Sequence, residues 1–233
     1  MKKLIALALA AAALIPSAEA KTVTETRSIE SFEKLEASTA LNIIYVQGTP
    51  VSLKISGDQQ DVAAVSIKQR GDKLKIWRTD REQKNFGRHR TVTITVTTPV
   101  LRDIDLSGAC DFSAKRLSYS GDVEIDTSGA SKVSISDLNA QNVEIDCSGA
   151  SNIEVAKSST RKIELDLSGA SKASIAGSTG YLDLDCSGAS DASLGKLKAV
   201  EGKIDVSGAS KATTNVQQLR KSSSSGAATF RNR

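Results

Sequence analysis

The sequence is poor in aromatic residues, prolines, histidines and cysteines. Aromatic residues make up 3% of 233 residues, so a core must be filled by valine, isoleucine, leucine and alanine. With 3 prolines the chain is neither collagen-like nor proline-rich. One histidine and 3 cysteines leave little material for a conventional zinc site or a histidine-based catalytic triad. A hydrophobic share of 39% and a charged share of 25% fit a folded domain of ordinary solubility.

Long apolar runs are also scarce, and the clearest one stands at the N-terminus. Lys2 and Lys3 precede an apolar stretch over residues 4–15, and an A-x-A cleavage pattern ends at Ala20. The stretch is too short to span a bilayer as a helix. We therefore predict a signal peptide at residues 1–20 and no transmembrane segment in the mature chain. The expected location is the periplasm or the cell surface of a bacterium.

The sequence is rich in one repeat. Six copies of S-G-A-S or S-G-A-C lie within residues 103–215, and each follows a short segment in which apolar and acidic residues alternate, as in a half-buried strand. A fixed period of about 20 residues is typical of a solenoid. The turn glycines carry this period: Gly108, Gly129, Gly149, Gly169, Gly188 and Gly208.

Short strands joined by tight turns, at about 20 residues per repeat, close one coil of a β-solenoid. We predict an all-β fold, a single-stranded parallel β-helix that is right-handed by the usual crossover preference. Equivalent residues of stacked coils would form inward columns, and the glycines would supply a positive φ at each turn. The two inward columns are Ile104, Ile125, Ile145, Leu165, Leu184 and Ile204, then Leu106, Thr127, Cys147, Leu167, Cys186 and Val206.

Both ends of the chain lack the full pattern. Residues 21–102 contain strand-like segments, and residues 35–43 align by residue class with residues 104–112. We predict irregular N-terminal β coils of the same domain, with a separate small β-sandwich as the alternative. Residues 216–233 contain four basic residues, a serine run and no acid, so we expect a flexible basic tail.

These motifs resemble a known family. The segments F-E-K-L-E-A-S-T-A-L-N-I-I-Y-V-Q-G, from Phe32, and T-V-T-I-T-V-T-T-P-V-L-R-D-I-D-L-S-G, from Thr91, accompany the D-x-S-G-A-S ladder. Together they are similar to the bacterial family named putative auto-transporter adhesin, head GIN domain. The resemblance covers nearly all of the chain after the signal peptide. It implies an exported β-helical domain, and it brings no catalytic residues.

The repeat also predicts a ladder of carboxylates on the outer surface. Neighbouring unit charges in such a ladder repel by about 1 kcal/mol in water. Bound cations such as Ca²⁺, lysines such as Lys132, Lys172 and Lys211, or hydrogen bonds from turn amides and serines could offset this repulsion. We favour a solvated or turn-bonded face with no metal or other cofactor, and keep the ladder as the Ca²⁺ candidate: Asp105, Asp126, Asp146, Asp166, Asp185 and Asp205.

Charge is distributed unevenly along the chain. Residues 21–102 hold 14 basic and 9 acidic residues, whereas residues 103–215 hold 11 and 17. A polar segment within the basic part is a candidate for binding anionic groups or glycans, although a solvated loop is the simpler interpretation. Its candidate residues are Arg78, Arg81, Lys84, Arg88 and Arg90. His89 lies in the same segment and has no partner pattern that would make it catalytic.

The cysteines are expected to be free. Cys147 and Cys186 share an inward column but lie two coils apart, or about 9.6 Å. A disulfide needs Cα atoms within about 7 Å. Cys110 belongs to a different column at the turn, so we predict no disulfide despite the oxidising compartment.

The sequence favours a non-catalytic exported envelope or surface protein, a β-helical module for binding or adhesion. The expected partners are envelope glycans or another surface protein, with self-association as a further option and no nucleic acid. One alternative is a polysaccharide-active hydrolase or lyase, because glycosidases use paired carboxylates. Another is a cation-binding scaffold built on the aspartate ladder. Identical carboxylates in every coil argue against catalysis, which needs one asymmetric constellation.

Overall fold

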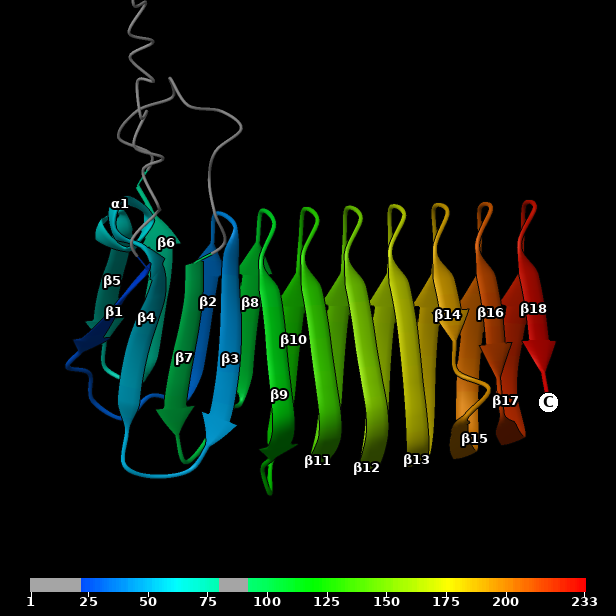
Figure 1. Ribbon diagram of the computed structural model, residues 1–233. Coiled ribbons are helices and arrows are strands. Elements are labelled where there is room, and N and C mark those ends of the chain that lie inside the picture. Colours follow the sequence, from blue (N-terminus) through cyan, green and yellow to red (C-terminus); the bar gives the residue numbers. More distant parts are fainter. Residues whose placement is uncertain (1–21, 80–91) are drawn as a thin grey trace, which may run out of the picture.

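The protein is a nearly all-β solenoid whose stacked coils form an elongated rod (Figure 1). The computed structural model describes residues 22–79 and 92–233, so the predicted signal peptide at residues 1–20 lies outside the described residues. The described part contains one short helix, α1 (Gln59–Ala63). Parallel pairing between successive coils of about 20 residues confirms the predicted β-helix.

Each coil of the regular shaft has two strands that flank a tight turn. The first strand runs toward the turn and the second runs away from it, after which the chain bends into the next coil. Some strands are long because they continue through this bend. The shaft contains β8 (Asp103–Ser107), β9 (Asp111–Ser118), β10 (Asp122–Thr127), β11 (Lys132–Cys147), β12 (Asn152–Leu167), β13 (Lys172–Cys186), β14 (Asp191–Ser193), β15 (Leu197–Val206) and β16 (Lys211–Thr214).

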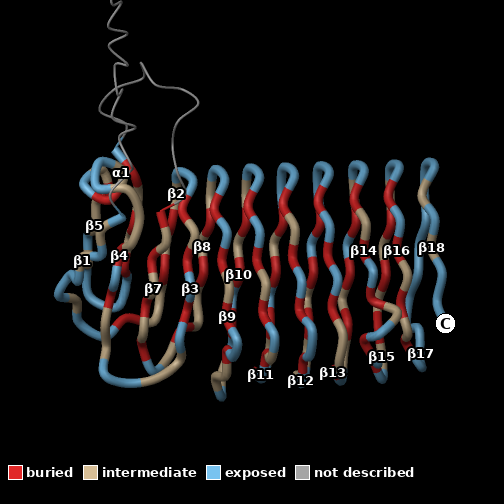
Figure 2. Tube along the Cα trace, in the orientation of Figure 1, coloured by how far each residue is buried: buried red, intermediate tan, exposed pale blue. Residues whose placement is uncertain are grey.

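The coils pair in the register that the repeat predicts. Ile125 pairs with Ile104 on one side and with Ile145 on the other. Both predicted inward columns are buried along their whole length (Figure 2). Apolar residues of the second strands, such as Val133 and Ile135, face them across the coil and complete one continuous aliphatic core.

Serine and glycine have separate roles in the S-G-A-S turn. The buried Ser151 hydroxyl donates a hydrogen bond to the carbonyl oxygen of Ser148 at 2.8 Å, which closes the turn. Gly149 has a φ of +73°, and a Cβ added there would lie 2.5 Å from the carbonyl oxygen of Gly129 in the preceding coil. The turn therefore requires glycine both for its dihedral angle and for the close approach of the coils.

The N-terminal part is continuous with the shaft and is not a separate sandwich. β2 (Lys34–Ser38) and β3 (Leu41–Gln47) pair in parallel with β8 and β9, and Leu35 pairs with Ile104 as the alignment of residues 35–43 predicts. Beyond this coil the pairing becomes mixed. β6 (Lys73–Arg78) and β7 (Val92–Thr98) stay parallel to β2 and β3, while antiparallel pairings cover the end. The remaining strands are β1 (Thr22–Arg27), β4 (Ser52–Asp58) and β5 (Val65–Arg70).

The expectation of a flexible tail at residues 216–233 is wrong. β17 (Val216–Ser224) pairs in parallel with β15, and β18 (Thr229–Asn232) pairs in parallel with β16. Gly226 has a φ of +73° and stacks on Gly208, so this segment makes one more turn of the same kind. The serine-rich composition is misleading here, because backbone pairing with β15 orders β17. The pairing forms even though its register places Ser222 and Ser224 opposite Ile204 and Val206.

The three cysteines are unpaired and buried. Cys147 and Cys186 occupy one inward column with Leu167 between them, in the predicted register. Burial raises the pKa of the Cys147 thiol to about 11 and that of Cys186 to about 12. Both thiols therefore stay protonated and unreactive in the folded protein.

A thiol reagent should accordingly leave the folded protein unmodified. After unfolding in denaturant without a reductant, all three cysteines should react, and mass spectrometry counts the modified residues. Two thiols that stay unlabelled after unfolding would reveal a disulfide and contradict the register of the columns.

Candidate functional site

Six aspartates line up on the outer face of the first strands. The pairing register places Asp126 between Asp105 and Asp146, and the column continues through Asp166 and Asp185 to Asp205. Each aspartate stands between two buried residues of its strand, so its side chain points outward. The fold therefore brings together the carboxylates that the repeat predicted.

Four of these carboxylates line a shallow groove of about 380 Å³ beside the turns. The groove crosses successive coils, which lie about 4.8 Å apart, so carboxylates and hydroxyls repeat along it at the pitch of the solenoid. We call it the acidic groove; its lining residues are Asp105, Asp126, Thr127, Ser128, Asp146, Cys147, Ser148, Asp166 and Ser168.

Hydrogen-bond partners hold both ends of the acidic column in the charged form. At the N-terminal end Glu36 continues the column and accepts hydrogen bonds from Lys73, at 2.8 Å, and from Lys75. These bonds lower the pKa of Glu36. At the C-terminal end Ser223 donates a hydrogen bond to Asp205 and thereby lowers the pKa of that carboxyl.

The middle of the ladder has no such partners. Within the described ranges, no side-chain hydrogen bond or ion pair involves the carboxylates of Asp126, Asp146 or Asp166. Burial raises the pKa of Asp126 to about 6, and the nearby carboxylates of Glu124 and Asp146 act in the same direction. Burial and like charges also raise the pKa of Asp166. Carboxyls with raised pKa values beside a groove are characteristic of functional sites.

The lysines and turn serines that the sequence suggested do not offset the charge repulsion in the middle of the ladder. Lys132, Lys172 and Lys211 begin the second strands, on the other side of each turn, and form no ion pair with the ladder in the described structure. The turn hydroxyls donate to carbonyl oxygens, as Ser148 does to Thr127. Nor do three acidic, histidine or cysteine side chains of the described ranges lie together as a metal site would require. Neither lysines nor turn hydroxyls of the described residues therefore reduce this repulsion, whereas solvent and proton uptake can.

A second outward acidic column lies two residues before the aspartates on each strand and has a lysine, Lys34 or Lys203, at either end. Its acidic members are Asp103, Glu124, Glu144, Glu164 and Asp183. Lys34 contacts Asp103 at 3.0 Å, and Lys203 contacts Asp183 at 3.3 Å. Such exposed ion pairs contribute little to stability, because water screens both charges. Ion pairs thus involve Asp103, Glu164 and Asp183 of this column, and none of its residues lines the acidic groove.

The predicted basic loop is represented in the structure by Arg78 alone. Arg78 is the last residue of β6, is buried, and donates a hydrogen bond to Asp61 at 2.6 Å. Its inclusion among exposed anion-binding residues is therefore corrected: it is an internal ion-pair residue of the N-terminal part. The other candidates lie outside the described residues: Arg81, Lys84, Arg88 and Arg90, together with His89.

The fold and the groove define a β-solenoid that presents a regular polar face along its axis. The chain belongs to the family named Putative auto-transporter adhesin, head GIN domain, whose model matches residues 31–233. This membership confirms the resemblance drawn from the turn and strand motifs. No curated protein matches the chain.

Solved structures of low sequence identity share the fold. A putative adhesin from Bacteroides fragilis has a TM-score of 0.79 at 21% identity, over 92% of this chain and 98% of that chain. A putative lipid binding protein from Parabacteroides distasonis has a TM-score of 0.74 at 13% identity, over 91% of this chain and 96% of that chain. A putative adhesin from Parabacteroides merdae has a TM-score of 0.70 at 18% identity, over 91% and 96% of the two chains.

No helix in the described part of the chain has the length and hydropathy needed to cross a membrane.

Proposed function

We propose that the chain is a non-catalytic binding module of the bacterial envelope, exported by residues 1–20, that holds a hydroxyl-rich envelope glycan along the acidic groove. The observation that carries this proposal is the repetition of carboxylates and serine hydroxyls at the coil pitch. Carboxylate oxygens accept strong, charge-assisted hydrogen bonds from hydroxyl groups. A groove with a repeating lining suits a polymer with a repeating unit, and the adhesin names of the family and of its structural neighbours are consistent with such binding.

The equivalence of the groove carboxylates supports binding without catalysis. A glycosidase needs one carboxyl that keeps its proton and one that loses it, which requires unlike surroundings. Here Asp105, Asp126 and Asp166 occupy the same strand position, and burial raises the pKa of all three. These three groove carboxyls are therefore shifted in the same direction and do not divide into an acid and a base.

Glycan binding should depend on the groove carboxylates. Isothermal titration with purified envelope glycan fragments should give saturable binding that weakens at least about tenfold in the double variant Asp126→Asn, Asp146→Asn, because two charge-assisted acceptors are lost. The matched control is Asp111→Asn, Asp191→Asn, which removes two carboxylates from the second-strand face.

Two results would contradict the proposed function. Unchanged binding in the groove variant would place the ligand elsewhere, and release of oligosaccharide products would favour the enzyme alternative. Fractionation of expressing cells should recover a chain shortened by residues 1–20 outside the cytoplasm, which tests export independently.

A further inference from the structure

The only tryptophan of the chain lies on the outer face that carries the acidic ladder. Trp77 stands between the buried Ile76 and the buried Arg78 on β6, so its half-buried indole points outward. Lys75, two residues earlier, points to the same side and contacts Glu36, which continues the aspartate column on β2. Trp77 therefore belongs to the same face as the acidic groove.

The strand register places Trp77 in line with the serines of the groove. Trp77 pairs with Ser38 on β2, and Ser38 pairs with Ser107 on β8. On the following coils the same position is held by Ser128 and Ser148, both of which line the acidic groove. With one strand spacing of about 4.8 Å per step, Trp77 lies roughly 10 Å from Ser107 and roughly 14 Å from Ser128. It stands at the N-terminal end of this serine row.

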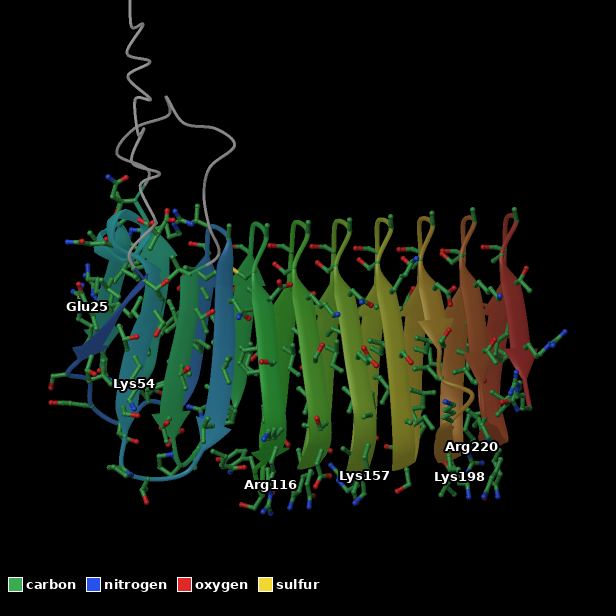
Figure 3. All side chains as sticks on the ribbon, viewed as in Figure 1. Glu25, Lys54, Arg116, Lys157, Lys198 and Arg220 are labelled. Atoms are coloured by element: carbon green, nitrogen blue, oxygen red, sulfur yellow. The ribbon has the colours of Figure 1, made fainter. Side chains whose placement is uncertain are left out.

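Only two small side chains separate the groove from Trp77 within this row. Ser38 and Ser107 are both half-buried, so a polymer that lies along the groove can continue over them. The long basic side chains labelled in Figure 3 point away from the strands at the edge opposite the turns and do not cover the row: Arg116, Lys157, Lys198 and Arg220. The row is therefore open from the groove to the indole.

The indole of Trp77 is also free to bind a ligand. Within residues 22–79 and 92–233 its N–H has no hydrogen-bond partner, and the nitrogen is not buried. A tryptophan ring presents a large apolar face with negative π charge, and its N–H donates hydrogen bonds. A pyranose ring has the complementary surface, because its C–H groups form an apolar face and its hydroxyls lie at the rim. Stacking of the two rings would engage both the face and the N–H of the indole.

We propose that Trp77 is a further binding residue of the acidic groove: its indole stacks on one pyranose ring of the bound glycan, and its N–H donates a hydrogen bond to a hydroxyl of that glycan. This inference rests on the proposed function and specifies its ligand. Asp105, a groove carboxylate on β8, lies two strands from Trp77, or about 10 Å away. The ligand must therefore be an oligosaccharide long enough to join the two positions, with an unsubstituted C–H face on the sugar that reaches Trp77.

A single tryptophan makes fluorescence a direct readout of this position. In the chain from Lys21 onward, which contains every described residue, acrylamide should quench the emission of the free protein, because the indole reaches solvent. The glycan probes are cellohexaose, maltohexaose, the linear hexamer of N-acetylglucosamine and purified envelope glycan fragments. A probe that binds in isothermal titration should shift the emission to shorter wavelength and protect it from acrylamide.

Substitutions separate stacking from a structural role of the ring. Trp77→Ala should weaken binding of the same probe roughly five- to tenfold in isothermal titration, whereas Trp77→Phe keeps an aromatic face and should retain most of the affinity. The matched control is Tyr181→Ala, which removes a half-buried ring from an outward position of β13 that pairs with Lys162 and Glu201, away from the serine row. It should leave binding unchanged, and urea unfolding checks that each variant is folded.

The two proposals fail in different ways. Acrylamide that does not quench the free protein, a bound probe that leaves the emission unchanged, or equal losses of affinity in Trp77→Ala and Trp77→Phe would overturn the role of Trp77. In each of these cases the proposed function still stands if Asp126→Asn, Asp146→Asn weakens binding. Conversely, a probe that protects Trp77 equally well in this groove variant would contradict the groove as the main binding site.

Discussion

Replacing Gly149 with alanine should lower the free energy of unfolding by about 3 kcal/mol. The new Cβ would lie 2.5 Å from the carbonyl oxygen of Gly129, which also accepts a hydrogen bond from the Ala150 amide at 2.7 Å. A φ of +73° adds a conformational cost for any residue with a Cβ. Relief requires the coil to move or the turn to change, and either disturbs the stacking on both neighbouring coils.

Two other glycines separate the causes of this loss. Gly71 has a φ of +56° but no atom within 4 Å of an added Cβ, so Gly71→Ala should cost only about 1 kcal/mol. Gly48 has neither a positive φ nor a close neighbour, and Gly48→Ala should stay within about 0.5 kcal/mol. Urea unfolding measures all three variants. A loss at Gly149 no larger than that at Gly71 would show that close coil stacking does not require glycine.

The protein should be about 1–2 kcal/mol more stable near pH 5 than near pH 8, after allowance for solvent screening of half-exposed groups. Burial and like charges raise the pKa of Asp105, Asp126, Glu144 and Asp166. In that interval the native ladder therefore binds more protons than the unfolded chain. This stability is complete below the unfolded pKa values and is lost as the pH rises through the folded ones, about 6 for Asp126.

The carboxyls at the two ends of the acidic column change the pH dependence of stability in the opposite direction. Hydrogen bonds lower the pKa values of Glu36 and Asp205, so their stabilisation is present above the unfolded values and is lost as the pH falls through the folded ones. Maximum stability is therefore expected between these two ranges, at about pH 4, close to the unfolded pKa values of Asp and Glu. Urea unfolding across a pH series measures the profile, and a steady gain in stability from about pH 5 to about pH 8 would contradict it.

Asp126→Asn should remove part of this pH dependence. Because the amide carries no charge, the variant should gain about 1 kcal/mol near pH 8 and show a flatter profile. Asp111→Asn, on the second-strand face beside the neutral Asn42 and the basic Lys132, should leave the profile unchanged. Equal effects of the two substitutions would mean that net charge, and not the ladder, governs the pH response.

The regular coils could be predicted residue by residue because the repeat couples two periods. Alternation along a strand decides which side chains face the core, and the coil period decides which residues stack. Together they place Ile125 between Ile104 and Ile145 before any coordinates are known. Residues 35–43 follow the same periodic rule, although their turn contains no glycine. Thr39 takes the place of the turn glycine, stacks on Gly108 and has a φ of +73°.

The predictions from the sequence were wrong where they relied on local composition and not on the repeat pattern. Residues 216–233 suggested a loose tail because serines dominate them, although Ser225, Gly226 and Ala227 repeat the turn motif. Arg78 was grouped with the basic residues that follow it, whereas the fold buries it against Asp61. In both cases the decisive partner, β15 for β17 and Asp61 for Arg78, lies outside the local segment.

By itself, the sequence determined the solenoid, its register, its inward columns and the existence of an aspartate ladder, because each of these follows from local periodicity. Tertiary structure decided how the N-terminal end is covered, which carboxylates have partners, and that residues 216–233 form one more coil on the shaft. These features depend on contacts between distant residues, and no periodic pattern in the sequence specifies them.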